Sequence, residues 1–155
     1  MKITLLVIGK TSEKYLKEGF DIYLKRLKKY ISFEFIEISD LKGKYDLISQ
    51  KRKEGEEILK HCEKFDYVIL LDEGGKMNTS IEFSEAIQKK LNTGIKSCCF
   101  VIGGPYGFSE DVYQKCNEKV SLSKMTFSHQ MVRLLFVEQL YRAFSILNNE
   151  PYHHV

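Results

Sequence analysis

The chain has 155 residues, of which 43% are hydrophobic and 29% charged, and its net charge is +3 at neutral pH. This length and composition exclude a disordered chain and predict one compact domain over 1–155 that needs no disulfide or metal for its core. The apolar start at 2–9 is too short for a signal peptide or a membrane span, so we expect a cytoplasmic protein without membrane contact.

Positive charge is concentrated early in the chain. Residues 1–60 hold 14 Lys and Arg against 10 Asp and Glu, with basic clusters at 25–26, 28–29 and 51–53. Such clusters form a solvated helix face more often than a nucleic-acid contact, and both interpretations stay open.

The cysteines and histidines show no metal-binding pattern. Cys62, Cys98, Cys99 and Cys116 form no Cys-x-x-Cys pair, and the histidines lack zinc-ligand spacing. We expect neither a metal site nor a disulfide. Cys98 and Cys99 lie in an apolar run, where a thiol behaves as a small hydrophobic group.

In the first half of the chain, residues 2–9 are typical of a buried strand. Ser12 is then placed to cap a helix, and four apolar residues share one face of it: Leu16, Phe20, Leu24 and Leu27. Residues 33–38 alternate apolar and polar side chains, which predicts a half-buried strand. A basic loop and a charged helix through about Cys62 follow.

In the second half, residues 67–71 and 98–102 are predicted buried strands, and 120–122 a short last strand. The Thr79-Ser80-Ile81-Glu82 capping box predicts a helix to about Leu91, Ser109 is placed to cap the next helix, and the last helix spans about 129–147. Strands that alternate with helices indicate an α/β fold, with a mostly parallel sheet covered by helices on both faces.

The last helix is apolar around nearly its whole circumference. A surface helix of a small α/β domain normally keeps a polar outer stripe. Either the helix is fully buried within one chain or it forms a subunit interface, and the terminal position favours the interface.

Three loops follow predicted strands, where open α/β sheets bind ligands: 72–76, 103–107 and 121–128. The loop at 103–107 has three glycines and a proline, which allow close backbone approach. It is neither Gly-x-Gly-x-x-Gly nor a P-loop, so no nucleotide of those classes is indicated. Residues 122–131 mix hydroxyl and large apolar groups, as a loop that cups a flat ligand does. The tail at 149–155 is by itself typical of a frayed end.

Six groups of residues stand in a specific order along the chain: residues 2–10, Leu71-Asp72 with Gly75-Lys76, Ile102-Gly103-Gly104 with Gly107, 122–127 with His129-Gln130, Tyr141-Arg142-Ala143, and Pro151-Tyr152-His153. In these motifs, and over nearly its full length, the chain resembles the RlmH family of SPOUT methyltransferases.

The resemblance implies a trefoil-knotted α/β fold, a homodimer, and methylation of N3 of a pseudouridine in the 23S ribosomal RNA of the assembled ribosome. It also implies S-adenosylmethionine as the methyl donor, without a metal. The implied cofactor contacts are Leu71, Gly103, Leu122, Ser123, Lys124, Met125, Thr126 and Phe127.

Methyl transfer to nitrogen is an in-line displacement that needs donor and acceptor within ~3–3.5 Å. A uracil-type N3 must also lose its proton before it attacks. We therefore expect His153 to be the proton acceptor or relay, Arg142 the cation near the base or a phosphate, and Tyr152 the group that stacks on or orients the base. An ion pair with Glu138, one helical turn back, is an equal alternative for Arg142.

Two positions depart from the family pattern. Ser128 replaces the usual proline, and a serine can cap the helix instead. His154 replaces the usual Lys or Arg, so a phosphate contact at that position is in doubt at neutral pH.

The alternative function is a non-catalytic RNA- or ribosome-binding protein of the same fold. A hydrolase is disfavoured because the chain lacks a Gly-x-Ser-x-Gly elbow.

Overall fold

A computed structural model describes residues 1–154 of the chain. Strands and helices alternate along it in the order β1 (Lys2–Ile8), α1 (Lys14–Leu27), β2 (Ser32–Ile38), α2 (Leu47–Cys62), β3 (Tyr67–Met77), α3 (Ser80–Asn92), β4 (Ser97–Ile102), α4 (Glu110–Lys115), β5 (Glu118–Ser121) and α5 (Met131–Leu147).

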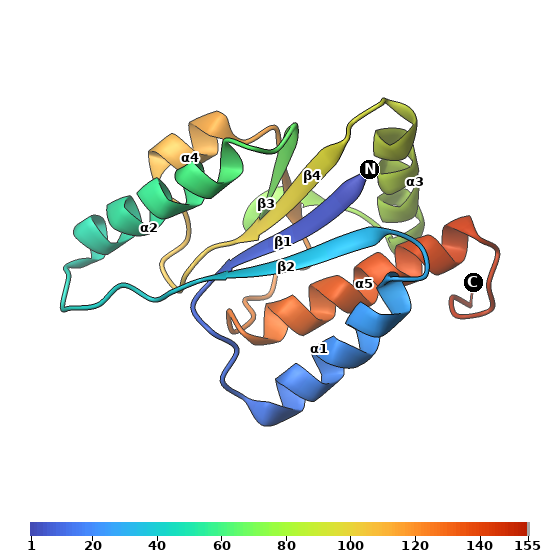
Figure 1. Ribbon diagram of the computed structural model, residues 1–155, viewed down its shortest axis with the longest axis horizontal. Helices are drawn as coiled ribbons and strands as arrows, with labels where there is room; N and C mark the ends of the chain where they lie inside the picture. The colour runs from blue at the N-terminus through green and yellow to red at the C-terminus, as the bar shows by residue number, and fades with distance from the viewer. Residues whose placement is uncertain (155) are drawn as a thin grey trace.

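The strands form one parallel sheet in the order β2-β1-β4-β3-β5. Helices α2 and α4 pack together on one face, and α1 and α3 both pack on α5 on the other (Figure 1). Side chains of β1 alternate between the two cores, since Leu5 and Val7 belong to the core with α5 and Leu6 to the core with α2. The predicted α/β class is confirmed.

Cys98 and Cys99 are fully buried on opposite faces of β4, as the apolar run predicted. Burial raises the pKa of the Cys98 thiol to about 12, so this thiol stays protonated. Within residues 1–154 no helix is long and apolar enough to cross a membrane.

The structure corrects one of the predicted helix caps and one loop. Ser12 does not cap α1, whose N-cap residue is Glu13. Ser109 is the N-cap residue of α4, as predicted, but its side chain makes no capping hydrogen bond. The segment 72–76, predicted as a loop, is part of β3, which pairs with β5 again at Lys76 after an irregularity. A Cβ on Gly75 would lie 2.6 Å from the Val120 backbone, so only glycine lets the two strands approach here.

Helix α5 is largely buried within the single chain. Phe136, Val137, Leu140 and Ala143 are fully buried, and no residue of the helix is classed as exposed. The apolar circumference therefore follows mainly from packing against the sheet, α1 and α3, and does not by itself require a subunit interface. Passage of this helix through a loop, as a knot, stays a prediction.

A buried arginine anchors the start of α5 to the loop after β1. The Arg133 guanidinium, 1% exposed, donates to the Ile8 carbonyl at 2.6 Å, the Thr11 hydroxyl at 2.8 Å and the His129 carbonyl at 3.1 Å. The Glu37 carboxylate lies 3.8 Å away and compensates the charge. Burial lowers the pKa of Arg133, while Glu37 opposes that change.

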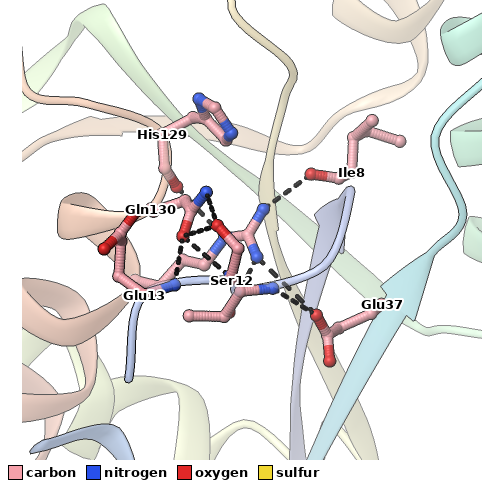
Figure 2. A network of polar contacts seen from close by, with 8 residues as sticks. Ile8, Ser12, Glu13, Glu37, His129 and Gln130 are labelled. Carbon is pink, nitrogen blue, oxygen red and sulfur yellow. Dashed lines mark hydrogen bonds and ion pairs between the residues drawn. The ribbon is translucent and has the colours of Figure 1, made fainter. Parts of the chain in front are cut away.

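Gln130 strengthens the same junction. Its Oε1 accepts from the Ser12 amide at 2.9 Å and the Glu13 amide at 3.3 Å, and Glu37 accepts from the Thr11 amide at 2.7 Å (Figure 2). These backbone donors of the β1–α1 loop are thus satisfied by side chains from α5 and β2. Together with Arg133 they fix the position at which α5 begins.

We predict that Arg133→Leu lowers the free energy of unfolding by about 3 kcal/mol or more, because two carbonyls, a hydroxyl and Glu37 lose their partner in the interior. Arg52→Ala is the control, since Arg52 is exposed and its pair with Glu56 is worth at most about 0.5 kcal/mol. Urea denaturation at one protein concentration measures both, and equal midpoints for the two variants would contradict the anchoring role.

Candidate functional site

A cavity of about 550 Å³ opens at the carboxyl ends of β4 and β5 and beside the middle of β3, where the pairing of β3 with β4 ends. This is the edge at which parallel α/β sheets bind ligands, and the volume is that of a site for a small organic molecule. Its lining comes from residues 71–73 of β3, the 103–108 loop, the 120–129 segment and Val132 of α5. A second cavity of about 560 Å³, between α3 and the β3–β5 edge, is lined mainly by lysines and glutamates and lacks such loops.

The glycines of the 103–107 loop are needed for its close packing. A Cβ on Gly103 would lie 3.1 Å from the Phe108 ring, and one on Gly104 would lie 2.5 Å from Oε2 of Glu54. Gly107 has a φ of +76° and donates its amide to the Gly104 carbonyl at 3.1 Å. The backbone of this loop therefore forms one wall of the cavity, as its composition predicted.

Glu54 supports this loop from behind and was not recognised from the sequence. The residue is 4% exposed, and its Oε1 accepts from the side-chain amide of Gln50 at 2.9 Å. Its Oε2, next to Gly104, has no hydrogen-bond partner among residues 1–154. A glutamate on a charged amphipathic helix resembles its solvated neighbours, so nothing in the local sequence marks this one as buried.

The 121–128 segment forms the opposite wall and is held by its own hydroxyl groups. Ser121 Oγ donates to the Ser123 carbonyl at 2.8 Å, and Ser123 Oγ accepts from the Met125 amide at 3.0 Å. Met125 is 74% exposed and Phe127 37%, so these two large apolar side chains of the wall are only partly covered by the rest of the chain. Ser128 Oγ accepts from the Met131 amide at 3.1 Å, although the N-cap residue of α5 is Gln130 and not Ser128.

An acidic group, also missed from the sequence as a site residue, stands on the β3 side. Asp72 lines the cavity and accepts from the Tyr113 hydroxyl at 2.6 Å and from the Gly74 amide at 2.8 Å. Burial and the neighbouring Asp72 raise the pKa of Tyr113, so the phenol remains a donor. With Glu73 beside it, this wall favours a ligand that carries positive charge.

The residues that the family resemblance assigned to the cofactor meet at this cavity, with one exception. The lining includes Leu71, Gly103, Leu122, Ser123, Met125, Thr126 and Phe127. Lys124 is exposed and does not line it. Residues separated by more than fifty positions in the chain are thus brought together at one sheet edge.

The C-terminal tail packs on α5, so the prediction of a frayed end is wrong for the described residues. The Tyr152 hydroxyl donates to Glu138 Oε1 at 2.9 Å and lies 3.1 Å from the Tyr23 hydroxyl. Its ring lies 4.7 Å from the Tyr141 ring, centre to centre. Burial, together with Tyr23 and Glu138, raises the pKa of Tyr152, so it stays protonated at neutral pH.

Arg142 forms the ion pair with Glu138 that was one of its two predicted roles, and its contact with a base or phosphate stays a prediction. Its Nη2 donates to Glu138 Oε1 at 2.6 Å, and its guanidinium lies over the Tyr152 ring at 4.6 Å. Its Nη1 also lies 3.4 Å from Nδ1 of His153. The three residues expected to act on the base, Arg142, Tyr152 and His153, therefore form one cluster.

This cluster and the cavity lie at opposite ends of α5. Val132 lines the cavity, and Arg142 follows ten residues later, which places it about 15 Å further along a helix that rises 1.5 Å per residue. Figure 1 shows the tail on the side of the molecule away from the carboxyl ends of the strands. One chain does not bring the two groups of predicted site residues together.

Fold and cavity define an α/β protein with a cavity of the size of a small organic ligand at the carboxyl edge of a parallel sheet. Residues 1–153 match the family described as Predicted SPOUT methyltransferase. The chain belongs to this SPOUT methyltransferase family.

Similar proteins agree with this assignment. The chain is 60% identical to the ribosomal RNA large subunit methyltransferase H of Christiangramia forsetii and 58% identical to that of Flavobacterium psychrophilum, over 99% of both chains in each pair. In structure it is similar to a probable methylase family protein from Haemophilus influenzae, with a TM-score of 0.57, 14% identity, and coverage of 99% of this chain and 70% of that one. At that identity, the structural similarity shows the fold alone.

We predict that Gly104→Ala lowers the free energy of unfolding by about 1–3 kcal/mol, because its Cβ meets the buried Glu54 carboxylate. In a Glu54→Ala background the same substitution costs less, since the clashing group is gone. A double-mutant cycle by urea denaturation measures the coupling. Strictly additive effects would show that Glu54 does not contact the loop in solution.

Proposed function

We propose that this protein transfers a methyl group from S-adenosylmethionine to N3 of a pseudouridine in the 23S ribosomal RNA of the assembled large subunit or ribosome, and hence acts in the cytoplasm. The observation that carries the proposal is the cavity at the strand ends, whose lining coincides with the cofactor contacts expected for this family. Relatives that are 51–60% identical over 99% of this chain are named ribosomal RNA large subunit methyltransferase H.

The residues of the cavity fit S-adenosylmethionine. Leu71, Gly103 and the run at 122–127 would hold it, with Met125 and Phe127 covering its apolar parts and backbone groups of the two loops binding its polar ones. Asp72 and Glu73 complement a cation. When bound, the cofactor would supply a methyl group on a positively charged sulfur, and the sulfur would leave as a neutral thioether when a nucleophile attacks the methyl carbon.

In this proposal Arg142, Tyr152 and His153 meet the target base. The Arg142 guanidinium favours the imide anion that forms when N3 loses its proton, because an adjacent cation stabilises negative charge. Tyr152 is held rigidly by Glu138 and Tyr141 and orients the base. His153 contacts the edge of the base.

A homodimer follows from the placement of these groups. Because the cavity and the tail lie at opposite ends of α5, a site that uses both requires the tail of a second copy. The half-buried Met131, Leu135 and Ile146 on α5 are available for such a contact. We propose that each complete site combines the cavity of one chain with the tail of its partner.

Basic side chains next to the tail support an RNA substrate. Lys25, Arg26, Lys28 and Lys29, at the end of α1, are all exposed. The same helix end contacts the tail, since Tyr23 meets Tyr152 and Tyr30, just beyond α1, meets Glu150. Phosphates bound at this surface would add a salt-dependent share of the affinity.

The function is tested by mass spectrometry of ribosomal RNA from cells with and without the gene. We expect the deletion strain to lack one methyl group on a pseudouridine of the 23S RNA, and a plasmid copy of this chain to restore it. Calorimetry with S-adenosylmethionine accompanies the test. Unchanged RNA and no measurable affinity for the cofactor would instead leave a non-catalytic RNA-binding protein of this fold.

The composite site is tested by co-expressing two inactive variants with different affinity tags. Thr126→Trp fills the cavity from an exposed position, and His153→Ala removes the imidazole. Dimers purified through both tags carry one intact site of two, so we expect about half of the wild-type methylation rate. Each variant alone should be slower than the wild type by about 100-fold or more. A rate no higher than that of either variant, or a monomer by light scattering, would refute the arrangement.

A further inference from the structure

The orientation of Arg142 is fixed by a carboxylate whose two oxygens are both engaged. Oε1 of Glu138 accepts from Arg142 at 2.6 Å and from the Tyr152 hydroxyl at 2.9 Å. Its Oε2 accepts from the side-chain amide of Gln139 at 2.7 Å. The Arg142 and Glu138 side chains are only 24% and 18% exposed. Partial burial protects this ion pair from water, so the guanidinium has little freedom to turn.

The second terminal nitrogen of Arg142 determines which His153 nitrogen carries hydrogen. Nη1 of Arg142 lies 3.4 Å from Nδ1 of His153. A guanidinium has five N–H donors and no acceptor, so Nδ1 must be the acceptor in this contact. In a neutral imidazole with a free lone pair on Nδ1, the hydrogen is on Nε2.

We infer that His153 is a neutral hydrogen-bond donor that presents Nε2–H to an acceptor oxygen of the target base, with Glu138 and Arg142 as the pair that sets its tautomer. This inference rests on the proposed function, and it replaces the expectation from sequence that His153 accepts a proton. In this role His153 neither gains nor loses a proton during the reaction: the N3 proton passes to solvent water, and N3 then attacks the methyl carbon while the neutral thioether of the cofactor would leave.

This role fits the chemistry of a uracil-type base. N3 lies between two carbonyl groups, and the negative charge of the imide anion is shared with their oxygens. A fixed N–H donor at one of these oxygens stabilises the anion, as oxyanion-hole donors do in other enzymes. The nitrogen that could accept a proton is turned toward Arg142 and is therefore unavailable to N3.

Other titratable or charged groups surround the same cluster. They are Tyr23 and Arg26 on α1, Glu138, Tyr141 and Arg142 on α5, and Tyr152 in the tail. Tyr152 keeps its proton at neutral pH because burial raises its pKa, and its hydroxyl is directed to Glu138. Within the described residues of this cluster, Nε2 of His153 makes no hydrogen bond to another protein group, so its N–H can face a base.

The test compares His153→Gln, His153→Asn and His153→Ala in the full-length protein, with ribosomes from the deletion strain as substrate. A glutamine amide places its N–H near the position of Nε2, whereas an asparagine amide places it near Nδ1, and neither amide accepts a proton near neutral pH. We expect His153→Gln to stay within about tenfold of the wild-type kcat. The Asn and Ala variants should lose about 100-fold, the effect of one positioned donor.

A pH profile of the wild-type kcat/KM gives an independent readout. N3 must lose its proton in every variant and His153 takes up none, so we expect the wild-type and His153→Gln profiles to run parallel. A fall in activity at acid pH that is steeper in the wild type than in His153→Gln would overturn the inference, and so would a Gln variant as slow as the Ala variant. If the wild-type protein itself transfers no methyl group to ribosomes, the proposed function fails, which is a different outcome.

Glu138→Gln tests the positioning pair. Loss of the carboxylate charge releases Arg142, so we expect kcat to fall about tenfold while the affinity for S-adenosylmethionine, measured by calorimetry, is unchanged. Glu138 is not among the residues that line the cavity and would hold the cofactor, which is why cofactor binding should not respond. A parallel fall in cofactor affinity would indicate a general structural effect and contradict the positioning role.

Discussion

The functional edge of this molecule depends on the burial of one positive charge. Arg133 is 1% exposed, and removal of a guanidinium from water is unfavourable unless every donor finds a partner. Ile8, Thr11 and His129 supply those partners, and Glu37 supplies the opposite charge. As a result the loop after β1 and the start of α5 are held at one place. The 122–130 segment connects β5 to this anchored helix, so both ends of the cavity wall that it forms are held in place.

The cavity is built mainly from backbone, and its few side chains have distinct roles. Glycines at 103, 104 and 107 allow the loop to lie against Phe108 and Glu54, and serine hydroxyls shape the opposite wall. Asp72, held by the Tyr113 hydroxyl, adds negative charge without being free to move. Such a site selects a flat, partly apolar cation by shape and charge, which agrees with membership of a methyltransferase family.

The same helix that closes the cavity also carries the tail, but at its far end. Glu138 and Arg142 hold Tyr152 and His153 about 15 Å along α5 from the cavity. Within one chain, the helix therefore separates the cavity, where the methyl donor is proposed to bind, from the groups proposed to meet the base. This separation makes the oligomeric state part of the proposed chemistry.

The sequence by itself determined the features that depend on neighbours in the chain. Apolar runs and helical spacing predicted the alternation of strands and helices, the Thr79–Glu82 capping box was correct, and the motifs at 103–107 and 122–127 marked the cavity. Only the tertiary structure decided the rest. Arg133 with Ile8, Asp72 with Tyr113, and Glu54 beneath Gly104 are pairs that folding brings together from distant positions. A charged residue on a helix has the same local pattern whether it is solvated or buried, because its partner is chosen by packing and not by the adjacent sequence.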